Sequence, residues 1–203
     1  NVTPPPTLTP VPTETLIPTP SPTPISYESL IPAGWKRFKP EAAPGMEIWL
    51  PSSYVQQTEK EKQASTPIYD IEATRPLMAL KDNTKSPYLV FTTFEGSVRP
   101  TFSNNLDEMI DSEFGALMRS GRLLERDNFI FVTETYPARR LIIDKTVNGV
   151  NAGMAIYVVQ VKGDLYYLGF VTAFNELYTR LPAFDQSMQT FRVVPIIPTP
   201  VPT

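Results

Sequence analysis

The sequence predicts an α+β domain in which a single antiparallel β-sheet is covered by helices on both faces, an α/β/α sandwich. The first observation is a series of apolar segments separated by Asn148-Gly149 and Gly163-Asp164, which are two-residue hairpin signals. The second is that these segments carry apolar residues on both faces, so the sheet needs cover on both sides. The third is a segment between residues 105 and 121 with helical apolar spacing, which can supply such cover.

In the first part of the chain that follows the Thr- and Pro-rich N-terminal end, the sequence predicts short strands and little helix. Strands are expected at 34–38, 46–50, 77–81 and 88–94. Pro87 and Gly96 bound the last of these strands. The polar segment 54–63 is expected to form a short helix. Arg75-Pro76 argues against a helix in the region that follows, because a residue before proline avoids the helical conformation.

The clearest helix lies between Asn105 and Gly121. Its apolar residues recur at three- and four-residue spacing and share one face; they are Leu106, Met109, Ile110, Phe114, Leu117 and Met118. Asn105 followed by Glu108 resembles a capping box, and Gly121 is a C-terminal stop signal. The acidic residues of the segment gather in its N-terminal half, where the helix dipole favours them.

The segment from residue 128 onward is predicted as an antiparallel meander of four strands, at 128–135, 138–147, 150–162 and 165–173. The first turn is expected at Tyr136-Pro137, before the two glycine turns already named. In the third strand Tyr157, Val159 and Val161 share one face and Ile156 and Val158 the other, while in the fourth strand Leu165, Tyr167 and Val171 oppose Tyr166, Leu168 and Phe170.

The C-terminal part of the body is expected to add helical cover to this sheet. A turn of helix begins at 175–180, and Pro182 is expected as the first residue of a second helix. The apolar stripe of that second helix comprises Phe184, Ser187, Met188 and Phe191.

The two ends of the chain differ sharply from the body in composition. Of the 23 prolines, ten lie in residues 1–32 and four in 195–203. Tracts of Thr and Pro bury nothing and stay extended, so we expect 1–30 to be a disordered stalk and 195–203 a similar tail. In the polyproline-II conformation, at about 3.1 Å per residue, the first 24 residues would reach roughly 75 Å. Between the ends, 31–194 is long enough for one globular domain that buries about 70% of its unfolded surface.

Composition excludes several classes of chemistry. The chain has no cysteine and no histidine, so Ser-His-Asp and Cys-His catalysis, disulfide exchange and ordinary zinc sites are excluded. Net charge is −3 and the basic residues are scattered, which argues against nucleic-acid binding. No stretch approaches 18 consecutive apolar residues, and no signal peptide is present, so an exported protein would be represented here by its mature form.

The last part of the body resembles a known family. The tyrosine-rich pair of strands 157–170, followed by Phe184-Asp-Gln-Ser and Thr190-Phe-Arg192, is similar to the end of PsbP-like domains, which share a fold with the Mog family of Ran-binding proteins. Gly34-Trp35, Pro51 and the central helix also fit, and the resemblance covers about 32–194. It implies an antiparallel sheet between helical layers, used for protein association and not for catalysis. The Thr-Pro tail is similar to that of bacterial members that look like stalked lipoproteins. The resemblance transfers no functional residues.

The remaining candidates for a polar site are carboxylates and arginines. Asp107, Glu108 and Asp111 are neighbouring carboxylates of the kind that a hydrolase could use, but a capped, solvated helix face explains them as well. Asp82-Asn83 lacks the partners that a calcium loop needs. Of Arg139-Arg140, one is expected to face solvent and the other to pair with a carboxylate, and the pair could also contact a partner.

Aromatic side chains are the remaining candidates for a binding groove. Such a groove, for sugar or peptide, could be lined by Trp35, Trp49, Tyr157, Tyr166 and Tyr167. The same spacing is equally explained by core packing.

The sequence therefore predicts a non-enzymatic, extracytoplasmic binding or assembly domain of a surface lipoprotein, which acts through association with another protein. The sequence predicts no catalytic, cofactor-binding or metal-binding residues, and no cofactor is expected. In this hypothesis the protein is attached to the membrane only through a lipidated cysteine upstream of Asn1, a residue that this sequence does not contain. A small-ligand or carbohydrate-binding module of a larger cell-surface protein is the first alternative, and a carboxylate-based hydrolase is the second. The identity of the partner and the oligomeric state stay open.

Overall fold

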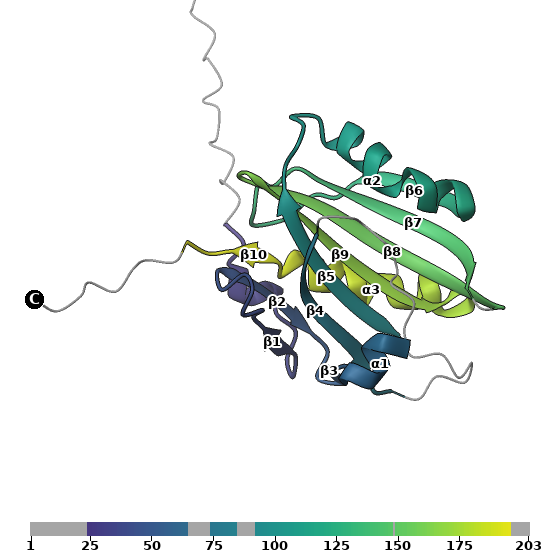
Figure 1. Cartoon of the computed structure of the whole chain (residues 1–203). Coiled ribbons are helices and arrows are strands. Elements are labelled where there is room, and N and C mark those ends of the chain that lie inside the picture. The colour runs from purple at the N-terminus through teal and green to yellow at the C-terminus, as the bar shows by residue number, and fades with distance from the viewer. Residues whose placement is uncertain (1–23, 65–73, 85–91, 148, 196–203) are drawn as a thin grey trace, which may run out of the picture.

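The computed structural model describes residues 24–64, 74–84, 92–147 and 149–195. Its main feature is a seven-stranded antiparallel sheet with the strand order β3-β4-β5-β9-β8-β7-β6 (Figure 1). These strands are β3 (Tyr54–Gln56), β4 (Arg75–Asp82), β5 (Thr93–Pro100), β6 (Arg122–Asn128), β7 (Ala138–Val147), β8 (Val150–Val161) and β9 (Asp164–Ala173).

A smaller antiparallel sheet has the order β1-β2-β10, and its strand β2 packs together with α3 against one face of the main sheet. It consists of β1 (Lys36–Phe38), β2 (Met46–Leu50) and β10 (Arg192–Val193). The helices are η1 (Tyr27–Leu30), α1 (Glu59–Ala64), α2 (Leu106–Ser120) and α3 (Phe174–Gln189), of which η1 is a 3₁₀ helix. The predicted α+β class is confirmed, and the small sheet adds to the single sheet that was expected.

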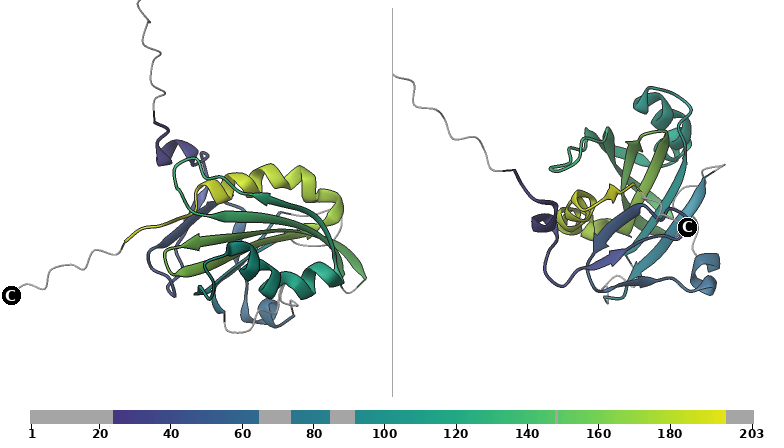
Figure 2. Two further views of the ribbon diagram at one scale, coloured as in Figure 1. Left: turned by 90° about the horizontal axis from the view of Figure 1, so that it is seen from above. Right: turned by 90° about the vertical axis from the view of Figure 1, so that its left-hand side faces the viewer.

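The two long helices cover opposite faces of the main sheet, as Figure 2 shows from above. Between α2 and one face of the strands lies a core formed by buried side chains of both. It includes Ile110, Phe114, Ile143, Ile156, Val158, Leu165 and Tyr167. Under α3 and β2, the other face contributes a larger core that includes Ile48, Phe94, Tyr157, Val159, Leu168, Phe170 and Phe184. The predicted assignment of faces in β8 and β9 is confirmed residue by residue.

Helix α2 begins and ends where the sequence predicted. The Asn105 side chain accepts hydrogen bonds from the backbone N–H of Asp107 (3.0 Å) and Glu108 (3.4 Å), and Gly121 follows the last turn. The reciprocal half of the capping box is replaced, because Glu108 accepts a hydrogen bond from the Ser103 hydroxyl (2.8 Å) instead.

Helix α3 is continuous through Pro182, so the prediction of two helices was wrong. An internal proline removes the hydrogen bond to the carbonyl of Tyr178 and costs about 3 kcal/mol. Burial outweighs this cost, since Leu177, Phe184 and Met188 are almost fully buried and each contributes roughly 1.5–3 kcal/mol. The Phe184 ring stacks on that of Phe170 with centroids 4.3 Å apart.

Close contact between α3 and the sheet depends on a glycine. A Cβ atom on Gly153 of β8 would lie 2.8 Å from Cβ of Leu177, closer than side chains pack. Gly153 therefore lets the helix approach the strand at this point.

The prediction of a strand at 128–135 was also wrong. The strand that pairs with β7 is β6, which comes earlier in the chain and ends at Asn128. Residues 129–132 alternate between buried and exposed, but in the described chain no strand is assigned to 129–137. Strand β6 lacks the apolar pattern of a strand because it lies at the edge of the sheet, where charged residues such as Arg122 and Asp127 are favoured. A β-bulge at Leu124 further disturbs its alternation.

Other boundaries moved by a few residues. Strand β5 continues past Gly96 to Pro100, while residues 88–91 of the predicted strand lie outside the described residues. The segment predicted as one helix at 54–63 divides into β3 and α1. The second glycine turn consists of Lys162 and Gly163, with Lys162 at a φ of 55°, and Asp164 already belongs to β9. The first glycine turn includes Asn148, which lies outside the described residues.

The first and last described segments meet at one end of the molecule (Figure 1). The Tyr27 hydroxyl of η1 donates a hydrogen bond to the carbonyl of Thr190 (2.7 Å), and the Arg192 guanidinium lies 3.6 Å from the centre of the Tyr27 ring. The folded part thus includes Tyr27–Leu30, which precede the expected domain start at residue 31. Within the described ranges no helix is both long and apolar enough to cross a membrane.

Candidate binding surface

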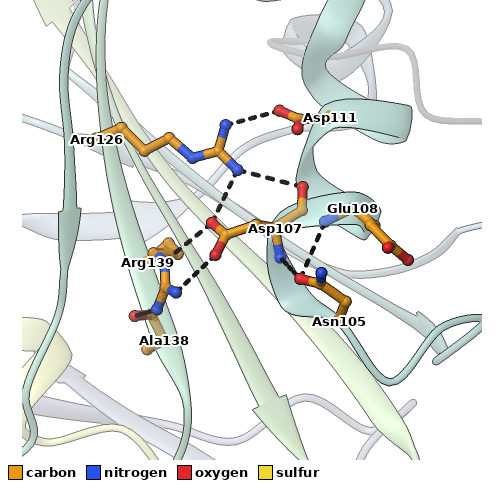
Figure 3. A network of polar contacts seen from close by, with 7 residues as sticks. All are labelled: Asn105, Asp107, Glu108, Asp111, Arg126, Ala138 and Arg139. Carbon is orange, nitrogen blue, oxygen red and sulfur yellow. Dashed lines mark hydrogen bonds and ion pairs between the residues drawn. The ribbon is translucent and has the colours of Figure 1, made fainter.

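The carboxylates of α2 form part of an ion-pair network that ties this helix to the sheet (Figure 3). Asp107 lies between two arginines, with oxygens 2.8 Å from Nη2 of Arg126 on β6 and 2.7 Å from Nη2 of Arg139 on β7. Arg126 also contacts Asp111 at 2.6 Å. Hydrogen bonds from Arg139, and then from Arg126, hold the pKa of Asp107 below its ordinary value despite partial burial. Asp107 and Asp111 are thus neutralised by arginines that connect α2 to the sheet.

Arg140 forms the equivalent connection on the opposite face of the sheet. Its guanidinium lies 2.8 Å from Asp185 of α3 and 3.3 Å from both Glu125 and Asp127 of β6. The buried Tyr157 hydroxyl donates a hydrogen bond to the same Asp185 (2.7 Å). Burial, followed by the charge of Asp185, raises the pKa of Tyr157. The expectation that one of Arg139 and Arg140 would face solvent was wrong, because alternate strand residues reach both helical layers.

The aromatic residues proposed for a groove are mostly core residues. Tyr157 and Tyr167 are fully buried and Tyr166 nearly so. The Tyr167 ring packs edge-on against Phe114 of α2, with centroids 5.3 Å apart. The groove interpretation of these tyrosines is therefore wrong. Trp35 and Trp49 are partly buried.

Asp82 has a structural role as well. It is buried at the end of β4, 2.9 Å from the Arg180 guanidinium of α3, and it accepts a hydrogen bond from the Thr84 hydroxyl (2.6 Å). Among the residues that the structure describes, no group of three or more Asp, Glu, His or Cys could hold a metal ion.

Among the described residues, the most exposed large apolar side chain lies in the segment 129–137, which we call the apolar loop. Ile130 is 77% exposed and Val132 is 50% exposed, whereas the alternate residues Phe129 and Phe131 are buried. Phe129 packs edge-on against Tyr157 with centroids 5.1 Å apart. The apolar loop therefore turns one row of side chains into the core and the other into solvent.

The backbone of the apolar loop is fixed by the end of α3. The side-chain amide of Gln189 donates to the carbonyl of Ile130 (2.9 Å) and its oxygen accepts from the N–H of Val132 (2.9 Å). The Tyr136 hydroxyl accepts a hydrogen bond from the N–H of Val193 on β10 (3.3 Å). A hollow of about 600 Å³ lies against the loop; its lining includes Phe129, Ile130, Phe131, Glu134, Tyr136 and Arg139. The apolar run Phe-Ile-Phe-Val is the sequence signal for this surface, and it lies within the segment 128–135 that was predicted as a strand.

The helical layers on either face of the antiparallel sheet define a fold of the Mog/PsbP type. One solved structure with this similarity is cyanobacterial PsbP from Synechocystis, 14% identical, which covers 79% of this chain and 93% of its own with a TM-score of 0.50. Another is LpqN of Mycobacterium tuberculosis, 10% identical, which covers 79% of this chain and 92% of its own with a TM-score of 0.52.

The similarity to these structures concerns the fold, and it confirms the resemblance noted in the sequence. No family model matches the chain, and no curated protein is significantly similar to it in sequence.

Proposed function

We propose that this chain is a non-enzymatic binding domain that acts outside the cytoplasm by associating with another protein, and that the apolar loop is the contact surface. The observation that carries the proposal is the pair Ile130 and Val132, held in solvent on a loop whose underside is anchored in the core.

The anchoring of the apolar loop favours association. A rigid loop loses little conformational entropy on binding, so more of the contact energy is available for affinity. Full burial of an exposed Ile or Val side chain contributes roughly 1.5–3 kcal/mol. The adjoining hollow could receive a side chain of the partner, which is the usual arrangement at the energetic centre of an interface.

The arrangement of the polar groups also supports a non-enzymatic role. Of the three carboxylates considered for hydrolysis, Asp107 and Asp111 are bound by Arg126, whereas Glu108 accepts a hydrogen bond from Ser103. Asp82, which was considered for calcium, is bound by Arg180. These ion pairs connect secondary-structure elements, which gives the acids a structural role.

Placement outside the cytoplasm rests on the ends of the chain. In this proposal, the Thr- and Pro-rich ends of the chain, 1–26 and 195–203, are spacers that hold the domain between them away from a cell surface, with a lipidated cysteine upstream of Asn1 as the anchor. LpqN, which has the same fold, is described as involved in cell envelope biogenesis. The full-length gene product tests the anchor directly, since the absence of an upstream lipidation cysteine would rule it out.

The contact surface can be tested by affinity capture from a cell-envelope extract of the source organism. We compare the unchanged chain with the double variant Ile130→Asp/Val132→Asp and with Val150→Asp, a control at the far end of β8 that introduces a charge at another exposed valine. The proposal expects a captured protein that is lost with the double variant and kept with the control. Equal capture by all three chains would overturn it.

A further inference from the structure

A second surface, built from other residues, carries a surplus of positive charge. It is a hollow of about 310 Å³ beside the small sheet, which we call the basic hollow; its lining includes Arg37, Lys39, Gly45, Glu47, Arg192 and Val194.

Glu47 lies at the base of the basic hollow and is only 3% exposed. One of its oxygens accepts hydrogen bonds from Nε of Arg192 (2.7 Å) and from the Tyr27 hydroxyl (3.2 Å). Its other oxygen lies 3.3 Å from Nζ of Lys39 and 3.8 Å from Nη1 of Arg37. Burial by itself raises the pKa of Glu47, but the hydrogen bonds and charges of Arg192 and Lys39 outweigh it and lower the pKa, so the group stays ionised.

The cations of the basic hollow outnumber this single acid. Arg37 and Lys39 are about half exposed, with side-chain exposures of 50% and 49%. A guanidinium has five N–H donors and an ammonium three, far more than one carboxylate oxygen can accept. In the described part of the lining, three cations face one carboxylate, which leaves two positive charges in a chain whose net charge is −3.

The local backbone holds these groups in place. Arg192 lies opposite Glu47 in the pairing of β10 with β2, and Arg37 belongs to β1, which pairs with the other edge of β2. The N–H of Val194 donates to the carbonyl of Gly45 (2.7 Å), and a Cβ on Gly45 would lie 2.5 Å from the carbonyl oxygen of Val194. Three strands thus converge on the hollow, and the glycine permits their close contact.

We propose that the basic hollow is a binding site for a phosphate group, held by Arg37 and Lys39 above the Glu47–Arg192 pair. A phosphate monoester carries about −1.5 to −2 charges at neutral pH, which matches the two surplus positive charges, whereas a carboxylate would neutralise only one. Arg and Lys are the side chains that bind phosphate oxygens most strongly. The phosphate can be free or part of a larger monoester.

Isothermal titration at constant ionic strength tests the proposal, with inorganic phosphate and glycerol 3-phosphate as probes and acetate as the singly charged comparison. We expect saturable phosphate binding with a dissociation constant in the millimolar range or below, and at least tenfold weaker binding of acetate. Stronger binding of glycerol 3-phosphate than of inorganic phosphate would identify a monoester as the source. The reverse order would identify free phosphate.

The matched variants separate a site from a general charge effect. The double variant Arg37→Gln/Lys39→Gln should weaken phosphate binding at least tenfold, while Lys60→Gln/Lys145→Gln, with the same change in charge outside the hollow, should leave it unchanged. Equal weakening in both, or no saturable binding by the unchanged chain, would overturn the proposal. If the first double variant fails to fold, Lys39→Gln alone serves, with Lys60→Gln as its control.

The basic hollow shares no lining residue with the hollow beside the apolar loop, and neither Ile130 nor Val132 belongs to it. The variant Ile130→Asp/Val132→Asp should therefore bind phosphate as the unchanged chain does, so the two proposals can fail separately.

Discussion

Replacement of Asp107 by Asn tests whether the acidic cluster of α2 is structural. Asp107 is 43% exposed and contacts two arginines that are about one quarter exposed. An exposed ion pair contributes up to about 1 kcal/mol and a hydrogen bond to a charged group roughly 1.5–3 kcal/mol when buried. For this half-exposed site we expect a loss of about 1–2 kcal/mol in the free energy of unfolding, and a drop of about 3–6 °C in the melting temperature.

The control for this prediction is Asp111→Asn. Asp111 is 61% exposed and contacts Arg126 alone, so its replacement should cost about 0.5 kcal/mol or less. Urea titrations at pH 7 with equal slopes would measure both changes. Equal costs for the two variants would refute the view that Asp107 is the centre of the network.

The pH dependence gives the same prediction a second readout. The pKa of Asp107 is lowered in the folded protein, so its stabilising contribution is present above the unfolded pKa of about 3.9 and is lost as the pH falls through the folded pKa. The gap between the unchanged chain and Asp107→Asn should therefore shrink below about pH 4. A gap that stays constant on acidification would contradict an electrostatic origin.

Three further substitutions test the packing of α3 by urea titration. Phe184→Ala should cost about 3–5 kcal/mol, against less than about 1 kcal/mol for the exposed Phe102→Ala, and similar costs would contradict the account of the core. Gly153→Ala should cost about 1–3 kcal/mol because its new methyl group would collide with Leu177, and a neutral result would show that the helix can shift. Pro182→Ala should raise stability by about 1 kcal/mol or more, since it restores an N–H donor within the helix, and a loss would show that the proline ring contributes packing.

The parts of the fold that the sequence predicts well are those specified by local signals. Helix α2 combines apolar spacing with Asn105 and Gly121 at its ends, and strands β7 to β9 alternate between short turns. Each of these features involves residues that are near neighbours in the chain. Signals between near neighbours in the chain are therefore sufficient to predict strands β7 to β9 and helix α2.

The features that were missed depend on distant partners. Strand β6 is charged because it lies at the edge of the sheet, and α3 tolerates Pro182 because the sheet beneath it buries the apolar side chains. The small sheet joins Glu47 to Arg192 across 145 positions of the chain. Periodicity along the sequence contains no signal for such contacts.

The candidate surfaces show the same division. The apolar run at 129–132 is visible in the sequence, but only the structure shows that Ile130 and Val132 face solvent while Gln189 holds the backbone beside them. The basic hollow combines residues of three strands that are far apart in the sequence. Its basic residues are scattered along the chain, so composition gives no signal for it.

Site-specific photo-crosslinking in the source organism tests the central claim most directly. A photoreactive amino acid at position 130 of the apolar loop should form a defined covalent adduct with a partner protein, while the same residue at the exposed position 150 should not. Adduct at 130 alone is the result that association through the apolar loop predicts. The absence of any adduct at 130, or the same adducts from both positions, would contradict it.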